Sequence, residues 1–193
     1  MLSEVLGFGF KEFRNNWKIL LLLGFLNSFL SFFIVFTEKT VVVLSIIILQ
    51  SFIYYKLYEL SYMIVFKGKP VMSNLFSSDK FTPFFITFII YILIIIFGTI
   101  LFIIPGIILS IMYQFSVYII FYKDMSLKER FVLSKNITYG QRWQLFKILT
   151  IMALILWVGS IISCVLLPVS FLVDAYIFKK LINGEKLKLI GKV

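Results

Sequence analysis

The sequence predicts an all-α polytopic membrane protein, a bundle of about six membrane-spanning helices preceded by an amphipathic helix at the membrane interface. Three observations predict this class. First, 61% of the 193 residues are hydrophobic and only 15% are charged, whereas soluble domains have roughly 45–50% apolar and about 25% charged residues. Second, the apolar residues gather in runs close to the roughly 20 residues that cross a bilayer as a helix. Third, the basic residues lie between these runs.

Residues 1–18 are expected to form the interfacial helix. Apolar side chains recur at helical spacing along one stripe, and most of the charged side chains lie off it. The stripe consists of Leu2, Leu6, Phe10, Phe13 and Trp17. Because this stretch contains acidic residues and no small-residue cleavage site, we interpret it as part of the mature chain rather than as a signal peptide.

Two predicted spans follow the interfacial helix. The first is residues 19–36, and the polar residues 37–40 form a short turn after it. The second begins at Val41 and continues to about Phe66, a length that allows the helix to tilt. Glycine, proline and several charged residues then predict a polar loop over residues 67–80.

The third predicted span, Phe84 to Ile104, begins after Pro83 and stops at Pro105 and Gly106. We expect the helix break at this dipeptide, because proline lacks an N–H donor and glycine relaxes the backbone. The fourth apolar stretch, Ile107 to Tyr122, is short for a full crossing. It therefore predicts either a span supported by interfacial Tyr and Lys side chains or a re-entrant hairpin.

The sequence from Ser126 to Glu129 has the spacing of a capping box, in which the serine and the glutamate each satisfy a backbone amide of the first turn. It predicts a short cytoplasmic helix over Leu127 to Asn136. The fifth predicted span runs from about Leu145 to Val165. The sixth runs from about Leu166 to Phe178, after a corner at Pro168.

All of the chain is expected to form one integral membrane domain, with a bundle over residues 19–182 and a basic cytoplasmic tail over residues 183–193. Of the 19 Lys and Arg residues, all but two fall in segments on one side of the predicted bundle. The exceptions are Lys39, in a turn on the other side, and Lys56, within a span. The positive-inside rule therefore places both termini in the cytoplasm. The scarcity of alanine indicates an AT-rich genome, so we expect a bacterial plasma membrane.

The second half of the chain resembles a broad family of small bacterial multi-pass membrane proteins of uncharacterised function. It is also similar to the membrane domain attached to some glycerophosphodiester phosphodiesterases. The residues that carry the resemblance are Ile103 to Ile108, Tyr118 to Ile120, Ser126 to Glu129, Ser134 and Lys135, and Gly140 to Phe146. The resemblance covers about Leu60 to Lys180 and implies a topology. It implies no catalysis here, because the chain has Arg130 and Phe131 where the family has a small residue and has no phosphodiesterase domain.

Three ionisable residues within the predicted spans are candidate functional residues. Lys56 and Glu59 are three positions apart in the second span and therefore lie on the same helix face. Asp174 lies toward the cytoplasmic end of the sixth span. Charges at bilayer depth are rare and usually paired or hydrated, so we predict an intramembrane polar cluster of these three residues. Snorkelling to the interface is the alternative interpretation.

A second candidate site is the densest basic region of the chain. Its members are Lys128, Arg130, Lys135, Arg142, Trp143 and Lys147. These side chains could bind anionic lipid headgroups or an acidic partner. The alternative is a solvated loop that only follows the positive-inside rule.

The residue types in the chain exclude most familiar site chemistry. Histidine is absent and Cys164 is the single cysteine, so a zinc site, a histidine-based triad and a disulfide framework lack their residues. We therefore expect no cofactor, no metal and no enzyme activity. The dispersed basic residues also argue against a nucleic-acid partner.

These patterns favour a non-catalytic membrane protein, such as an envelope-maintenance factor, a transporter accessory or a self-immunity protein. Its expected partners are anionic membrane lipids, with a protein partner or a second copy of the chain also possible. The alternative function is a small proton- or ion-coupled transporter that uses Glu59 and Asp174.

Overall fold

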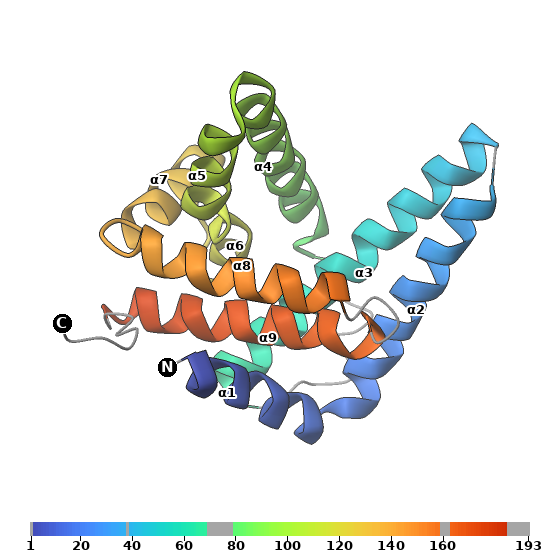
Figure 1. The fold of residues 1–193 in the computed structure, drawn as a ribbon, viewed down its shortest axis with the longest axis horizontal. Helices are drawn as coiled ribbons and strands as arrows, with labels where there is room; N and C mark the ends of the chain where they lie inside the picture. The colour runs from blue at the N-terminus through green and yellow to red at the C-terminus, as the bar shows by residue number, and fades with distance from the viewer. Residues whose placement is uncertain (1, 38, 69–78, 159–162, 185–193) are drawn as a thin grey trace. The chain divides into compact units, whose positions relative to one another are not determined.

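The computed structural model describes residues 2–37, 39–68, 79–158 and 163–184, and over these ranges its elements are all helices, joined by turns, with no strand (Figure 1). Most of the predicted polar loop and nearly all of the predicted basic tail lie outside the described residues. The helices are α1 (Leu2–Asn15), α2 (Trp17–Phe36), α3 (Thr40–Lys67), α4 (Phe81–Leu101), α5 (Ile103–Tyr113), α6 (Ser116–Tyr122), α7 (Leu127–Ile137), α8 (Arg142–Val158) and α9 (Ser163–Ile182).

Among the described residues, four helical segments are long and apolar enough to cross a membrane. They are Trp17–Ile34, Thr40–Lys67, Phe81–Leu101 and Ile103–Tyr122. The predicted all-α fold class is therefore confirmed, with helices of the kind that membrane proteins use. The count of six spans stays a prediction, because α8 has only 17 residues and the last turn of α9 contains Lys179 and Lys180.

The chain divides into two compact units, and the division falls within α8 and α9. One unit comprises residues 3–77 and 152–176, and the other comprises residues 78–151 and 177–193 together with the first two residues.

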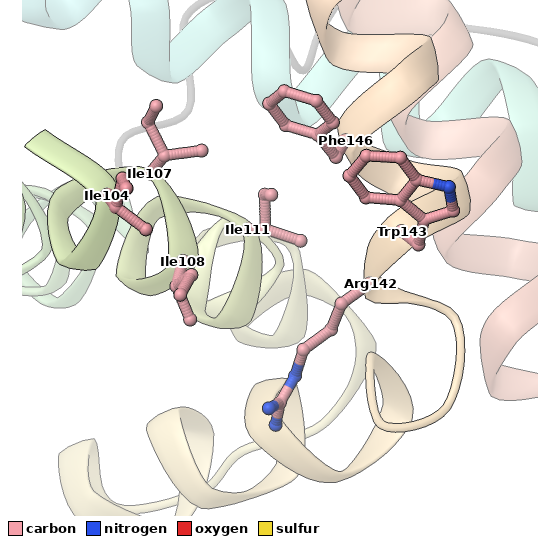
Figure 2. A pocket seen from close by; sticks show the side chains of 7 residues that line it. All are labelled: Ile104, Ile107, Ile108, Ile111, Arg142, Trp143 and Phe146. Carbon is pink, nitrogen blue, oxygen red and sulfur yellow. The ribbon is translucent and has the colours of Figure 1, made fainter.

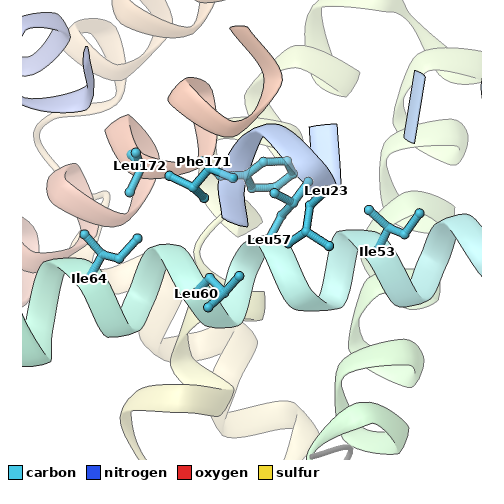
Figure 3. Packing of buried hydrophobic residues seen from close by; sticks show 8 residues of the cluster. Leu23, Ile53, Leu57, Leu60, Ile64, Phe171 and Leu172 are labelled. Carbon is cyan, nitrogen blue, oxygen red and sulfur yellow. The ribbon is translucent and has the colours of Figure 1, made fainter. Parts of the chain in front are cut away.

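The first of these units has a hydrophobic core built by α2, α3 and α9 (Figure 3). Its buried members are Leu20, Leu23, Ile53, Leu57, Leu60, Ile64, Phe171 and Leu172. Polar pairs tie α2 to α3 beside this core. Gln50 donates a hydrogen bond to Ser31 at 2.7 Å, and the Asn27 amide donates to the Tyr54 hydroxyl.

Helix α1 packs against α9 within the same unit. Phe8 stacks on Tyr176 with ring centroids 4.2 Å apart, and the Tyr176 hydroxyl donates to Glu4 at 3.1 Å. Val5 is fully buried, whereas Phe10 and Trp17 of the predicted apolar stripe are 47% and 50% exposed. The predicted helix is thus present, but it ends at Asn15, and Trp17 is the first residue of α2. Part of its apolar stripe stays on the surface, where a position at the membrane interface remains a prediction.

The predicted corner at Pro168 is wrong, because Pro168 lies inside α9. A proline at this position cannot donate to the carbonyl four residues earlier, which is that of Cys164. The α2 backbone lies against this same carbonyl, so closely that a Cβ added at Gly24 would collide with it. Helix α9 thus continues through Pro168 without the hydrogen bond to the Cys164 carbonyl, and α2 packs closely at this point.

The second unit contains a helical hairpin of α4 and α5. The backbone is extended at Phe102, with φ −162° and ψ 145°, and α5 begins at the next residue. The predicted break at Pro105 and Gly106 is therefore displaced to Phe102. Proline suits the first turn of a helix, where the N–H groups have no intrahelical partner, but clashes with a helix that continues before it.

Gly106 sets how closely the two helices of the hairpin approach. It is buried, and a Cβ added there would collide with the Thr99 hydroxyl and lie 2.9 Å from the Thr99 backbone nitrogen. The glycine predicted to break the helix is therefore required for packing instead.

A second discontinuity separates α5 from α6 at Gln114 and Phe115. Here the buried hydroxyl of Ser134, on α7, donates to the carbonyl of Met112 at 2.8 Å, and Ser116 donates to the carbonyl of Tyr113 at 2.7 Å. Side chains thereby serve carbonyl groups beside the break. The apolar stretch predicted over residues 107–122 is thus two short helices, which with residues 103–106 make a segment long enough for a span.

The start of α7 confirms the predicted capping box. The Ser126 hydroxyl accepts from the amide of Glu129 at 3.4 Å, and the Glu129 carboxylate accepts from the Ser126 amide at 2.8 Å. The helix runs from Leu127 to Ile137, one residue longer than predicted.

Candidate functional site

Lys56 and Glu59 form a buried ion pair on one face of α3. The Lys56 ammonium lies 2.7 Å from a Glu59 carboxylate oxygen, and the two side chains are 2% and 13% exposed. The ammonium also lies 4.6 Å from the ring centroid of Tyr55 and 5.6 Å from that of Phe52. Aromatic faces attract cations, so the rings and the carboxylate together stabilise a charge that burial disfavours.

Asp174 lies on α9, one turn after Phe171, which packs against α3 in the same unit. Its side chain is half-buried. In the described part of the chain Asp174 has no hydrogen bond and no ion pair. The structure thus brings Lys56 and Glu59 together and leaves Asp174 outside their ion pair. The three-residue cluster stays a prediction.

The sequence reasoning missed the aromatic partners of Lys56. Their signal was the helical spacing, since Phe52 precedes Lys56 by four residues and therefore lies on the same face. It also missed the polar contacts between α2 and α3, because Asn27 and Ser31 lie within the apolar run of the first predicted span. Asn27 is only 6% exposed, and its signal was an amide within a hydrophobic run.

The predicted basic region divides into exposed and inward-facing residues. Lys128 and Lys135 are exposed on α7, and Lys147 is exposed on α8. Trp143 is 66% exposed, and the Lys147 ammonium lies 5.6 Å from the centroid of its ring. We call these four residues the basic surface.

Arg130 does not belong to the basic surface, because it contacts α4. Its guanidinium donates to the Thr87 hydroxyl at 3.0 Å and to the Pro83 carbonyl at 3.4 Å. Burial lowers the pKa of Arg130, and Asp124 opposes this shift. An arginine stays protonated in any case, so Arg130 joins α7 to the first turns of α4 as a charged donor.

Lys80 makes a second connection in this unit that the sequence did not reveal. Its ammonium donates to the Ile120 carbonyl near the end of α6 and to the Asp124 carboxylate, both at 2.9 Å. The hydrogen bond from Lys80 is the main cause that lowers the pKa of Asp124. A lysine thus serves the carbonyl end of a helix, where positive charge is favourable.

An apolar groove lies between α5 and the first turns of α8 (Figure 2). Its volume is about 340 Å³. The lining residues are Ile104, Ile107, Ile108, Ile111, Arg142, Trp143 and Phe146. Arg142 and Trp143 therefore both line this groove, and Trp143 also belongs to the basic surface.

The protein is therefore all-α and has helices that are long and apolar enough for a membrane. It also has a buried ion pair and an exposed basic surface. Comparisons with protein-family models, with curated proteins and with solved structures found no significant match to this chain. Within the described ranges, no three Cys, Asp or Glu side chains gather where they could hold a metal ion.

Proposed function

We propose that this chain is a multi-pass membrane protein that acts by binding rather than by catalysis. It would serve as an envelope-maintenance factor, an accessory to a transporter or a self-immunity protein. The basic surface carries this proposal. Its three ammonium groups and one indole are exposed, and hydrogen bonds of Arg130 and Ser126 fix α7, which carries two of the lysines.

The chemistry of the basic surface fits an acidic partner at a membrane. A group of like charges attracts oppositely charged surfaces over several ångströms. An exposed tryptophan beside lysine suits the headgroup level of a bilayer, because the indole has an apolar body and a polar edge. The positive-inside rule supports a cytoplasmic position for this surface in a bacterial plasma membrane.

The second candidate function is transport coupled to protons or ions, with Glu59 and Asp174 as carriers of charge. The burial of Lys56 and Glu59 in an apolar helix favours it, because ionisable residues at such positions often mark an ion path. Against it, the charge of Glu59 is already balanced by Lys56 at 2.7 Å. We therefore prefer binding, because it explains the exposed basic surface, whereas transport has to rely on a glutamate that is already paired.

A complementation experiment separates the two functions. A strain that lacks this protein is challenged with detergent, osmotic shock and a membrane-active peptide, and survival is measured after return of the gene. The double variant Lys128→Glu with Lys135→Glu should fail to restore survival. The matched double variant Lys56→Met with Glu59→Gln should restore it if it folds.

The opposite pattern would contradict the binding function. So would proton uptake into vesicles that contain the purified protein, if the uptake disappeared in Glu59→Gln. Either result would favour the transporter.

A further inference from the structure

The hairpin of α4 and α5 ends in an exposed apolar tip that belongs to both helices. Its residues are Ile100 to Ile104, and each of the five is between 69% and 75% exposed. No Asp, Glu, Lys or Arg occurs between Lys80 and Lys123. The turn between α2 and α3, in contrast, contains Lys39. Water is therefore an unfavourable surrounding for the tip of this hairpin.

The hydroxyl groups near the tip all form hydrogen bonds within the hairpin. Thr99 donates to the Ile95 carbonyl and Ser110 donates to the Ile107 carbonyl, both at 2.8 Å. The Tyr91 hydroxyl reaches from α4 to α5 and donates to the Ser110 carbonyl at 3.2 Å. These groups need no water, which is the condition that hydrocarbon imposes on polar groups.

The turn at the tip is as short as the backbone allows. Only Phe102 separates the two helices, and its N–H donates to the Gly98 carbonyl at 3.1 Å. Its carbonyl accepts from the Gly106 amide at 3.3 Å, and Pro105 has no N–H that would need a partner. A longer turn would add unpaired backbone groups, which are costly in hydrocarbon.

Helix α7 shows how far the polar environment reaches along the hairpin. Lys128 and Lys135 are exposed on α7, and charged side chains are costly in hydrocarbon. We therefore place α7 outside the hydrocarbon core. Two hydrogen bonds connect it to the hairpin, one from Arg130 to α4 and one from Ser134 to α5.

The hairpin extends beyond these two contacts by less than the thickness of a membrane. Arg130 contacts α4 at Thr87, 15 residues before Phe102, and Ser134 contacts α5 at Met112, 10 residues after it. At 1.5 Å per residue these lengths are about 22 Å and about 15 Å, whereas a hydrocarbon core is roughly 30 Å thick. Helix α4 is long enough to cross a membrane, but its first turns lie on the α7 side of the contact.

We propose that the hairpin of α4 and α5 is a re-entrant membrane element. It enters the bilayer from the side of α7, ends with Phe102 among the acyl chains, and returns to the same side. The partner of the tip is the hydrocarbon of the bilayer, because a protein partner would cover one face whereas the exposed residues of the tip belong to both helices. The inference does not depend on the proposed function.

The orientation predicted from the basic residues is unchanged by this proposal. Both ends of a re-entrant hairpin lie on one side of the membrane, as they would after two complete crossings. What differs is the position of Phe102, which would reach the far headgroups in a complete crossing. The depth of Phe102 therefore tests the proposal.

Quenching of tryptophan fluorescence by brominated lipids measures this depth. In a background whose three native tryptophans are replaced by phenylalanine, Phe102→Trp places a single tryptophan at the tip. The protein is reconstituted into vesicles of phosphatidylglycerol and phosphatidylcholine, with bromine either near the headgroup or near the end of the acyl chains. Bromine near the chain ends should quench this tryptophan more strongly. The matched control Val132→Trp, exposed on α7, should show the opposite order.

Cysteine labelling gives a second measurement that needs no reconstitution. In a Cys164→Ser background, Phe102→Cys should resist a membrane-impermeant thiol reagent both in intact cells and after the cells are opened without detergent. It should react once SDS unfolds the protein. Thr40→Cys in the same background is the control and should react in intact cells. Circular dichroism of the purified variants verifies that each is folded.

Three results would overturn the proposal. Stronger quenching at the tip by bromine near the headgroup, or labelling of Phe102→Cys in intact cells, would show a complete crossing. Labelling only after the cells are opened would place the tip in the cytoplasm. Absence of quenching by bromine at either depth would show that a second copy or another protein covers the tip.

Discussion

Lys56 is a lysine side chain that is 2% exposed within a helix of mostly apolar residues. Its burial is tolerated because a carboxylate and two aromatic rings lie within reach of the ammonium. Removing two charges from water is expensive, and their attraction only partly offsets this. The intact pair therefore adds little to the net stability of the protein, whereas removal of one partner should be strongly destabilising.

Lys56→Met should destabilise the protein by about 3 kcal/mol, because it leaves the Glu59 carboxylate buried without its partner. The double variant Lys56→Met with Glu59→Gln should lose clearly less, since no unpaired charge remains. Unfolding by SDS in mixed micelles, followed by circular dichroism, measures both. Lys147→Met, at an exposed position, is the control and should change stability little. Equal losses in the single and double variants would disprove the coupling.

Glu129 and Asp124 are carboxylates outside the candidate spans, and each has a lowered pKa for a different reason. The hydrogen bond from the Ser126 side chain is the main cause for Glu129, and the hydrogen bond from Lys80 is the main cause for Asp124. A carboxylate whose pKa is lowered by folding stabilises the protein at pH values above the pKa that the group has in the unfolded chain. That contribution is lost as the pH falls through the folded value.

Ser126→Ala should raise the pKa of Glu129 toward its ordinary value of 4.5 and leave the pKa of Asp124 unchanged. Lys80→Gln should raise the pKa of Asp124 and leave the pKa of Glu129 unchanged. Carbon-13 NMR titration of the two carboxyl groups measures both effects, and each variant is the control for the other. The lost cap should also destabilise α7 by about 1 kcal/mol at neutral pH. A shift of both carboxyl groups in either variant would refute the separate causes.

The hairpin of α4 and α5 depends on small residues where the two helices approach. A Cβ added at Gly98 would lie 2.7 Å from the Leu109 side chain and 3.0 Å from the Gly106 Cα. Glycines on both helices therefore allow their backbones to come close. In a membrane such packing replaces the hydrophobic effect as a reason for helices to associate, since lipid tails are as apolar as the side chains.

Gly106→Ala should destabilise the hairpin by roughly 1–3 kcal/mol, because the added methyl group meets the Thr99 hydroxyl and backbone. Gly7→Ala is the matched control, since Gly7 is exposed on α1 and nothing lies within 4 Å of a Cβ there, and alanine favours a helix more than glycine does. Thermal unfolding in detergent compares the two. A Gly106→Ala protein as stable as Gly7→Ala would show that the close approach is dispensable.

At the scale of the molecule, the distribution of basic residues predicts the topology. The turn between α2 and α3 should face outward, and α7 should face the cytoplasm. Exposed residues are described in both places, Thr40 at the start of α3 and Asn136 near the end of α7.

A cysteine at Thr40 should react with a membrane-impermeant thiol reagent in intact cells, and a cysteine at Asn136 should react only after the cells are lysed. Both are introduced into a Cys164→Ser background, because Cys164 is the single native cysteine. Mass-tag gel shifts measure the labelling. Labelling of position 136 but not 40 in intact cells would invert the predicted topology.

Local patterns in the sequence determined the helices of this protein, because an apolar run and a capping box depend only on residues that are close together in the sequence. The α2 and α3 boundaries and the start of α7 were predictable to within two residues for this reason. The ion pair of Lys56 and Glu59 was predictable as well, because the two residues lie on one helix face.

The tertiary structure decided everything that depends on residues far apart in the chain. Pro168 lies inside α9, where α2 packs closely through Gly24. The break expected at Pro105 falls at Phe102, which leaves Gly106 inside α5 and against Thr99. Arg130 binds α4 while Arg142 lines a groove with α5, although both belong to one basic stretch of sequence. Spacing along the chain cannot distinguish these two arginines, because their different roles come from the helices that pack beside them.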